Sequence, residues 1–213
     1  GTIVIGLVGY FAYYNNVVST PNFTGWTSTF SIYDGNPNCQ YYIYGNTFQG
    51  GANNFIVRIQ TGYNQNVYFM NNIIDATLSP TYNTTRITWA NTSPTWSRIN
   101  GNLYGNLVDY NNELMSGNTM AELNALGAET IGVSANRWNV DPLFINSTAY
   151  DYTLQSGSPA INAGVTLGAP YNVDILGVSR PQGAAWDIGA YEIINEGIGG
   201  NNAPNQPSSP NPS

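Results

Sequence analysis

The sequence contains no lysine and no histidine, and its only cysteine is Cys39. Charged residues make up 8% of the chain, whereas typical soluble domains contain roughly 25%. The net charge is −7, with five arginines as the only basic side chains. Because phosphate binding requires clustered cations, this composition excludes nucleic acid as a partner. A single cysteine also excludes an internal disulfide and a Cys-x-x-Cys metal site.

Long apolar runs are absent as well. The most apolar stretch, residues 3–14, is shorter than the about 20 residues that a membrane-spanning helix needs, so no transmembrane segment is expected. The first residues have neither the basic region nor the cleavage site of a signal peptide. We interpret them as the first strand of a chain cut from a longer protein.

Asparagine, glycine and tyrosine are abundant instead, and they recur in register. One turn signature places an asparagine at four regularly spaced positions: Asn16, Asn46, Asn72 and Asn102. The residue before it alternates between Asn15, Gly45, Asn71 and Gly101. An apolar residue stands three positions earlier: Tyr13, Ile43, Phe69 and Ile99. Asparagine and glycine tolerate the left-handed backbone of a sharp corner, and stacked asparagines can hydrogen-bond to one another as a ladder.

A second β-strand precedes each of these units, at residues 2–7, 30–33, 55–59 and 86–89. Short strands repeating every 26–30 residues are typical of a solenoid. We therefore predict an all-β chain whose residues 1–105 form about four coils of a right-handed parallel β-helix. A β-sandwich is the main competing fold, although its strands do not usually keep one turn signature at such regular spacing.

Beyond residue 105 the periodicity stops. The segment 119–126 predicts one short helix, with Asn118 or Thr119 as its N-cap and Gly127 after its end. We expect residues 106–195 to contain the last coil and a C-terminal cap that covers the end of the solenoid. Residues 196–213 are rich in Gly, Asn, Pro and Ser, which predicts a linker to a further module or an anchor.

The cap region contains an ordered series of motifs: Asp141-Pro142-Leu143-Phe144, then Asp151-Tyr152-Thr153-Leu154 through Ser158-Pro159-Ala160-Ile161, then Asp174-Ile175-Leu176-Gly177, Arg180-Pro181-Gln182-Gly183 and Asp187-Ile188-Gly189-Ala190-Tyr191-Glu192. Residues 119–193 resemble the C-terminal end of secreted right-handed parallel β-helix repeat proteins of the choice-of-anchor Q type. The resemblance implies the fold and an extracellular or cell-surface location. It implies little about activity.

Candidate catalytic groups are few. A glycoside hydrolase needs two positioned carboxylates, and residues 1–105 contain only Asp34 and Asp75. A polysaccharide lyase would rely on arginines such as Arg58 and Arg98. We expect the later carboxylates to cap turns and to pair with Arg180. No catalytic residue, cofactor or metal ligand set is therefore assigned, and a structural Ca²⁺ has no supporting motif.

The tyrosines are better candidates for a binding site. The repeat register places four of them at positions that alternate with the buried ones, so they are expected to face outward: Tyr14, Tyr42, Tyr44 and Tyr68. Aromatic rings on an outer face stack on sugars or dock partner proteins. Simple cross-strand stacking that stabilises the sheet explains them equally well.

These observations favour a non-catalytic extracellular module for adhesion, surface architecture or glycan binding, with polysaccharides or other surface proteins as partners. A fragment of a polysaccharide lyase or glycoside hydrolase is one alternative. A self-assembling subunit that stacks through its solenoid ends is another. Asn-x-Ser/Thr sequons offer candidate glycosylation sites at Asn22, Asn83, Asn91 and Asn146.

Overall fold

The computed structural model describes the backbone of residues 2–4, 10–20, 28–34, 40–50, 55–61, 66–75, 87–89, 96–105, 137–138 and 140–194, and the side chains of residues 10–19, 40–50, 68–75, 100–105 and 140–194. Strands dominate these residues, so the predicted all-β class is confirmed. The helix expected at residues 119–126 lies outside them. No helix within the described part of the chain is long and apolar enough to cross a membrane.

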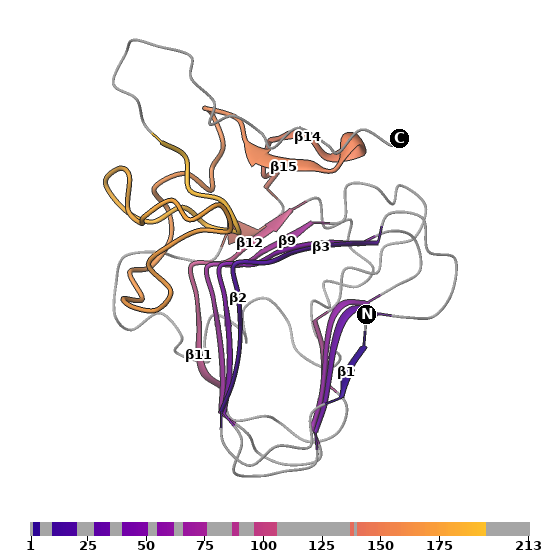
Figure 1. Ribbon diagram of the computed structural model, residues 1–213. Coiled ribbons are helices and arrows are strands. Elements are labelled where there is room, and N and C mark those ends of the chain that lie inside the picture. The colour runs from indigo at the N-terminus through magenta and orange to yellow at the C-terminus, as the bar shows by residue number, and fades with distance from the viewer. Residues whose placement is uncertain are drawn as a thin grey trace, which may run out of the picture.

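Most strands belong to three sheets in which all neighbours run parallel (Figure 1). The first sheet contains β1 (Thr2–Val4), β4 (Ser28–Asp34), β7 (Phe55–Thr61) and β10 (Ile87–Trp89). The second contains β2 (Tyr10–Tyr14), β5 (Gln40–Tyr44), β8 (Asn66–Met70) and β11 (Trp96–Asn100). The third contains β3 (Val17–Thr20), β6 (Thr47–Gly50), β9 (Ile73–Asp75), β12 (Leu103–Gly105) and β13 (Arg137–Trp138). Each sequence repeat thus contributes one strand to each sheet, whereas a β-sandwich would have required antiparallel pairing.

The side chains that alternate along these strands divide into an inner and an outer set. Ile43 pairs in register with Tyr13 on one side and Phe69 on the other, and both Ile43 and Phe69 are fully buried. Ile99 pairs with Phe69 through its backbone, while its side chain lies outside the described set. In the third sheet Phe48, Ile74 and Tyr104 form the equivalent buried column. The apolar residues that precede and follow each corner therefore build the core, as the repeat predicts.

The corner between the second and third sheets contains the asparagine ladder. Nδ2 of Asn16 donates to Oδ1 of Asn46 at 3.1 Å, and the same bond joins Asn46 to Asn72 at 3.0 Å and Asn72 to Asn102 at 3.1 Å. The backbone N–H of each donor residue points to the same oxygen. The predicted stacking of these four asparagines is confirmed. Asn46, Asn72 and Asn102 are fully buried, so the ladder satisfies polar groups that would otherwise be costly in the interior.

The residue before each ladder asparagine turns the corner in a left-handed backbone conformation. The φ angles are 53° at Asn15, 60° at Gly45, 56° at Asn71 and 63° at Gly101. Asparagine and glycine are the residues that adopt this region at least cost, which explains why the sequence uses only these two types here.

Residues 140–194, here called the C-terminal region, pack along the outer face of the third sheet (Figure 1). The hairpin of β14 (Phe144–Asn146), the 3-10 helix η1 (Ser147–Ala149) and β15 (Asp151–Leu154) begins this region, and irregular loops follow. Phe144, Tyr152, Leu154 and Ile188 bury apolar surface against Ile73 and Leu103. Residues 140–194 flank successive repeats along the side of the sheets, and a cap over the end of the repeats stays a prediction, because residues 106–136 lie outside the described set.

Removing one asparagine of the ladder should destabilise the fold, and the loss should be larger where the asparagine is more deeply buried. Asn72→Ala leaves three buried groups without the partner that Asn72 supplies: the Ile43 carbonyl, the Asn46 main-chain N–H and one N–H of the Asn46 side chain. Oδ1 of Asn102 keeps the main-chain N–H of residue 72. Each buried group left unsatisfied costs about 1–3 kcal/mol, so we expect a loss of at least ~3 kcal/mol in the free energy of unfolding. Asn16→Ala, at a half-buried rung, should cost less than half as much. Urea denaturation of both variants measures this difference, and equal losses would contradict the ladder's role.

The corner glycine at position 45 should not tolerate a side chain. Gly45→Ala strains a left-handed backbone and brings the new Cβ to 2.7 Å from Oδ1 of Asn15. Gly177→Ala is the matched control, because Gly177 also has a positive φ of 84° but faces open space. Both substitutions incur the backbone penalty of about 1–2 kcal/mol. Only Gly45→Ala should lower the free energy of unfolding by more than this penalty, as thermal and urea unfolding would measure. A decrease no larger than that of Gly177→Ala would refute the steric argument.

Candidate functional site

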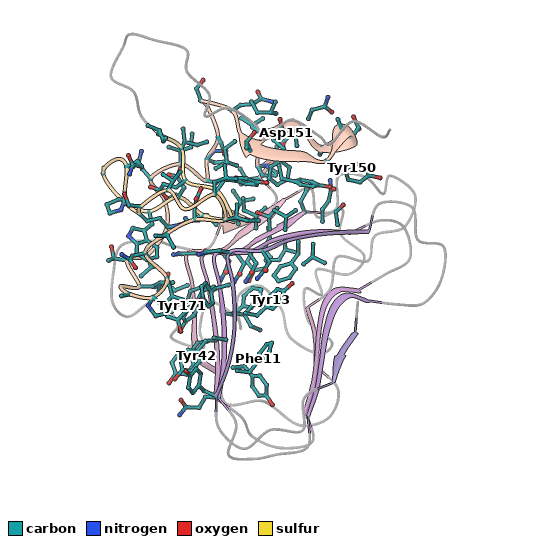
Figure 2. The ribbon with its side chains drawn as sticks, in the orientation of Figure 1. Phe11, Tyr13, Tyr42, Tyr150, Asp151 and Tyr171 are labelled. Carbon is teal, nitrogen blue, oxygen red and sulfur yellow. The ribbon has the colours of Figure 1, made fainter. Side chains whose placement is uncertain are left out.

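Tyrosines gather on the outer face of the second sheet, on the side opposite the core. Figure 2 shows Tyr42 outside the wall of strands, while Phe11 and Tyr13 point to its inner side. Tyr42 pairs in register with Tyr68, and their rings stack with centroids 4.7 Å apart and planes 14° from parallel. Tyr10 meets Tyr42 edge to face, with a centroid distance of 6.1 Å. We call Tyr10, Tyr14, Tyr42, Tyr44, Tyr68 and Tyr171 the tyrosine face.

The C-terminal region covers part of this face through Tyr171. Its ring meets Tyr14 at 5.0 Å and Tyr44 at 4.8 Å, both edge to face (Figure 2). Tyr44 lies on the outer face, but Tyr171 covers it, so it is only 5% exposed. Tyr14 remains 36% exposed, and Tyr42 and Tyr68 are partly exposed. Tyr171 was missed because it comes from a distant, irregular segment that the repeat register does not include.

Tyr10 is the most accessible member, at 72% exposure. It pairs in register with Gln40, not with another tyrosine, so the sequence offered only the alternation along β2 as a signal for it. The stacked rings of Tyr42 and Tyr68 each cover one face of the other, and Tyr10 and Tyr44 also contact Tyr42. A ligand that stacks on a ring face would therefore find Tyr10 first.

The polar groups of the tyrosine face are neutral. The hydroxyl of Tyr42 donates to Oε1 of Gln40 at 2.6 Å. Burial raises the pKa of Tyr42 above its usual value, and neighbouring Tyr68 raises it further. Burial likewise raises the pKa of Tyr171, with contributions from Tyr42, Tyr14 and Tyr10. These phenols stay protonated at neutral pH, and the described side chains of the face offer rings, hydroxyls and amides without charge.

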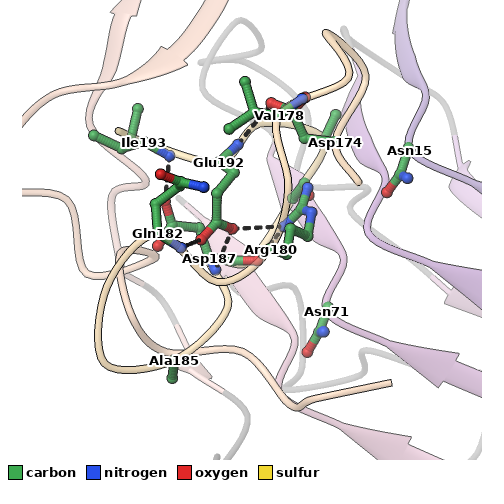
Figure 3. A network of polar contacts seen from close by, with 12 residues as sticks. Asn15, Asn71, Asp174, Val178, Arg180, Gln182, Ala185, Asp187, Glu192 and Ile193 are labelled. Atoms are coloured by element: carbon green, nitrogen blue, oxygen red, sulfur yellow. Dashed lines mark hydrogen bonds and ion pairs between the residues drawn. The ribbon is translucent and has the colours of Figure 1, made fainter. Parts of the chain in front are cut away.

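A second polar cluster lies inside the C-terminal region, around Arg180 (Figure 3). Nη1 of Arg180 donates to Oε2 of Glu192 at 3.3 Å and to the Asp187 carbonyl at 2.8 Å, and Nη2 donates to the Gly189 carbonyl at 2.8 Å. Burial lowers the pKa of the guanidinium, an effect that Glu192, Asp174 and Asp187 oppose. The predicted pairing of the later carboxylates with Arg180 is confirmed for Glu192.

The carboxylates of this cluster accept backbone N–H groups and so hold the loops in place. Asp174 accepts from Leu176 and Val178, each at 2.8 Å. Asp187 accepts from Asn162 and Ile193, each at 2.7 Å. Asp141 and Asp151 similarly accept the amides two residues ahead, at Leu143 and Thr153. These contacts are the turn-capping roles that the sequence predicts.

The corner asparagines attach this region to the sheets. Asn71 donates from Nδ2 to the Val165 carbonyl and accepts the Val165 N–H at Oδ1, both at 2.7 Å, while its own carbonyl accepts the Gly189 N–H at 2.8 Å. Asn15 donates from Nδ2 to the Val173 carbonyl. Gly45, between them, leaves room for Asn15. Asparagine at positions 15 and 71 therefore does more than form the turn, because its side chain also binds the C-terminal region.

The candidate catalytic carboxylates do not form an open pair among the described residues. Asp75 is fully buried beneath the C-terminal region, where Nε2 of Gln49 approaches its Oδ2 at 3.5 Å. Ser19, Gln49 and Asp75 lie in register on neighbouring strands. The Tyr152 hydroxyl contacts Gln49 and, at 2.6 Å, Oγ of Ser19. The side chains of Asp34, Arg58 and Arg98 lie outside the described set.

Of the four sequons, only Asn146 falls on described residues, and it is exposed on the hairpin. Its Oδ1 accepts from Oγ1 of Thr148 at 2.7 Å and from the Ala149 N–H at 3.1 Å. Asn22, Asn83 and Asn91 lie outside the described residues. Within the described part of the chain, no group of three or more His, Cys, Asp or Glu side chains is placed to hold a metal ion.

Comparison with protein-family models, with curated proteins and with solved structures gave no match for this chain.

The Arg180 cluster predicts an unusual pH dependence. Burial raises the pKa values of Asp187 and Glu192, although backbone amides and Arg180 lower them in part. The folded chain therefore keeps protons that the unfolded chain loses at a pH of about 4. These two groups should make the free energy of unfolding fall as the pH rises from the unfolded to the raised folded pKa.

The double variant Asp187→Asn with Glu192→Gln should lack this part of the pH profile, whereas Asp141→Asn, at an exposed turn, should keep it. Urea denaturation at constant ionic strength measures all three proteins. The free energy of unfolding of the wild type should therefore fall with pH in that window, relative to that of the double variant. A free energy that rises with pH relative to the double variant would contradict the assignment.

Proposed function

We propose that this chain is a non-catalytic extracellular module, built on a right-handed parallel β-helix, that binds neutral polysaccharide through its tyrosine face. The single observation that carries this proposal is the accessible part of that face, formed by Tyr10, Tyr14, Tyr42 and Tyr68 on a rigid sheet. Surface attachment or adhesion is the role that such a module would serve.

The parallel pairing and the strand order support the β-helix. Each sheet adds the equivalent strand of the next repeat as its neighbour, and the ladder keeps one corner in register through four repeats. These are the properties of a solenoid in which every repeat contacts only the repeats beside it. The resemblance of residues 119–193 to the choice-of-anchor Q type supports the same fold and an exported setting.

The chemistry of the tyrosine face supports a neutral, hydroxyl-rich ligand. Rings present flat apolar surface with little conformational freedom to lose, and phenol and amide groups hydrogen-bond to hydroxyls. The net charge of −7 disfavours a polyanionic chain. Because the described residues of the face carry no charge, binding should depend little on salt.

Carboxylates that are buried or engaged in turns support a non-catalytic role. A retaining or inverting hydrolase needs two carboxyl groups on either side of one substrate bond. Asp75 is sealed from solvent, and Asp174, Asp187 and Glu192 already accept backbone amides in the buried cluster.

Removing the most exposed ring should weaken binding. Tyr10→Ala should reduce retention on cellulose, chitin or starch about tenfold, which corresponds to ~1.4 kcal/mol of lost contact. The double change Tyr42→Ser with Tyr68→Ser should weaken it further while the chain stays folded. Tyr150→Ala is the matched control, since Tyr150 is 60% exposed but belongs to the hairpin of the C-terminal region.

Sedimentation with insoluble polysaccharides and affinity electrophoresis in soluble ones measure this binding. Circular dichroism then shows whether each variant is folded. Wild-type protein that binds none of the panel, or a double variant that unfolds, would refute the proposal and leave the rings with a purely structural role. Cleavage of any polysaccharide by the wild type would favour an enzyme.

A further inference from the structure

A serine hydroxyl and a glutamine amide from neighbouring repeats lie against each other beneath the C-terminal region. Ser19 on β3 and Gln49 on β6 occupy paired positions of the third sheet, and Oγ of Ser19 donates to Oε1 of Gln49 at 3.2 Å. Gln49 is fully buried and Ser19 is half-buried. Because paired strands hold both groups in place, the hydroxyl meets the amide at a far higher effective concentration than two free side chains would.

Tyr152 places a hydrogen-bond donor at the amide oxygen. Its hydroxyl contacts Oε1 of Gln49 and, at 2.6 Å, Oγ of Ser19, and the residue is only 2% exposed. When a nucleophile adds to an amide carbon, negative charge develops on the amide oxygen, and a fixed donor stabilises that charge. The same hydroxyl touches the serine oxygen, so it can pass the serine proton to the amide oxygen.

Asp75 lies on the other side of the same amide. It pairs in register with Gln49 through β9, and Nε2 of Gln49 donates to its Oδ2 at 3.5 Å. Asp75 is fully buried, so its carboxyl group stands beside the amide nitrogen in a site from which water is largely excluded. A carboxyl group in this place can transfer a proton to a departing nitrogen. The amide therefore has a nucleophile, a donor at its oxygen and an acid–base group at its nitrogen.

We propose that Ser19 and Gln49 form an intramolecular ester cross-link between their two repeats. Oγ of Ser19 adds to Cδ of Gln49, and the bond between Cδ and Nε2 then breaks. The serine proton leaves with the nitrogen, so one ester and one ammonia account for every atom. Burial of the site protects the ester from hydrolysis. The bond joins two repeats that a solenoid otherwise holds through non-covalent contacts, and it does not depend on polysaccharide binding.

Mass spectrometry of the purified chain tests the cross-link. The intact wild type should be lighter than the mass of its sequence by one ammonia, and proteolysis should release a branched peptide that contains Ser19 and Gln49. Mild alkali should hydrolyse the ester and separate the two peptides, with a glutamate side chain in place of the glutamine. Ser19→Ala should keep the full mass. Tyr152→Phe keeps the ring without the hydroxyl, so the rate of cross-linking should fall at least about tenfold.

Ser156→Ala and Tyr150→Phe are the matched controls, because both residues are exposed in the C-terminal region, and they should cross-link as the wild type does. A wild type of full mass would overturn the proposal, whether or not every variant folds. An ammonia loss that peptide mapping places at another residue would overturn it too, as would a loss at Gln49 that persists in Ser19→Ala. Circular dichroism shows whether each variant is folded.

Discussion

Hydrogen bonding between buried side-chain amides is the constraint on which the rest of the structure depends. A sharp corner repeated in successive strands brings backbone N–H and carbonyl groups into the interior, where each needs a partner. The asparagine at each corner supplies both kinds of partner at once: Asn72 accepts from the N–H and side chain of Asn46 and donates to Asn102 and to the Ile43 carbonyl. An aspartate lacks the donor and a leucine lacks both, so the ladder fixes residue type and register together.

The ladder also explains how the C-terminal region attaches. Because the asparagine at the ladder position points inward, the residue before it is left on the outside in a left-handed conformation that accepts only asparagine or glycine readily. Asn71 uses this position to hold Val165 from both sides, and Gly45 makes room for Asn15. Apolar contacts with Ile73 and Leu103 then hold the region along the third sheet, while the buried Arg180–Glu192 pair holds its own loops together.

The sequence predicts the features that are determined within one repeat, and it misses those that depend on contacts between distant segments. The corner, the ladder and the inward column of Ile43 and Phe69 depend on spacing within one repeat, and they were predicted. The burial of Tyr44 depends on Tyr171, which no local pattern connects to it. The strand β13 was also missed, because a longer interval precedes it, although Asn136 stands before it as Asn102 stands before β12. The placement of the C-terminal region depends on surface complementarity, which a list of turn motifs does not contain.

The aromatic rings that stabilise the sheet are the same rings that the proposed ligand would contact. Tyr42 and Tyr68 stack on each other, and Tyr14 and Tyr44 hold Tyr171, so most ring faces already contact another ring. Each such contact is worth about 0.5–1.5 kcal/mol beyond its buried area, and a ligand would have to compete with it. Tyr10 escapes this competition because it presents only an edge contact to Tyr42 and stands beside the small Ala12 on the outermost strand. Tyr10 is therefore the tyrosine of the proposed binding face whose ring is most available to a ligand.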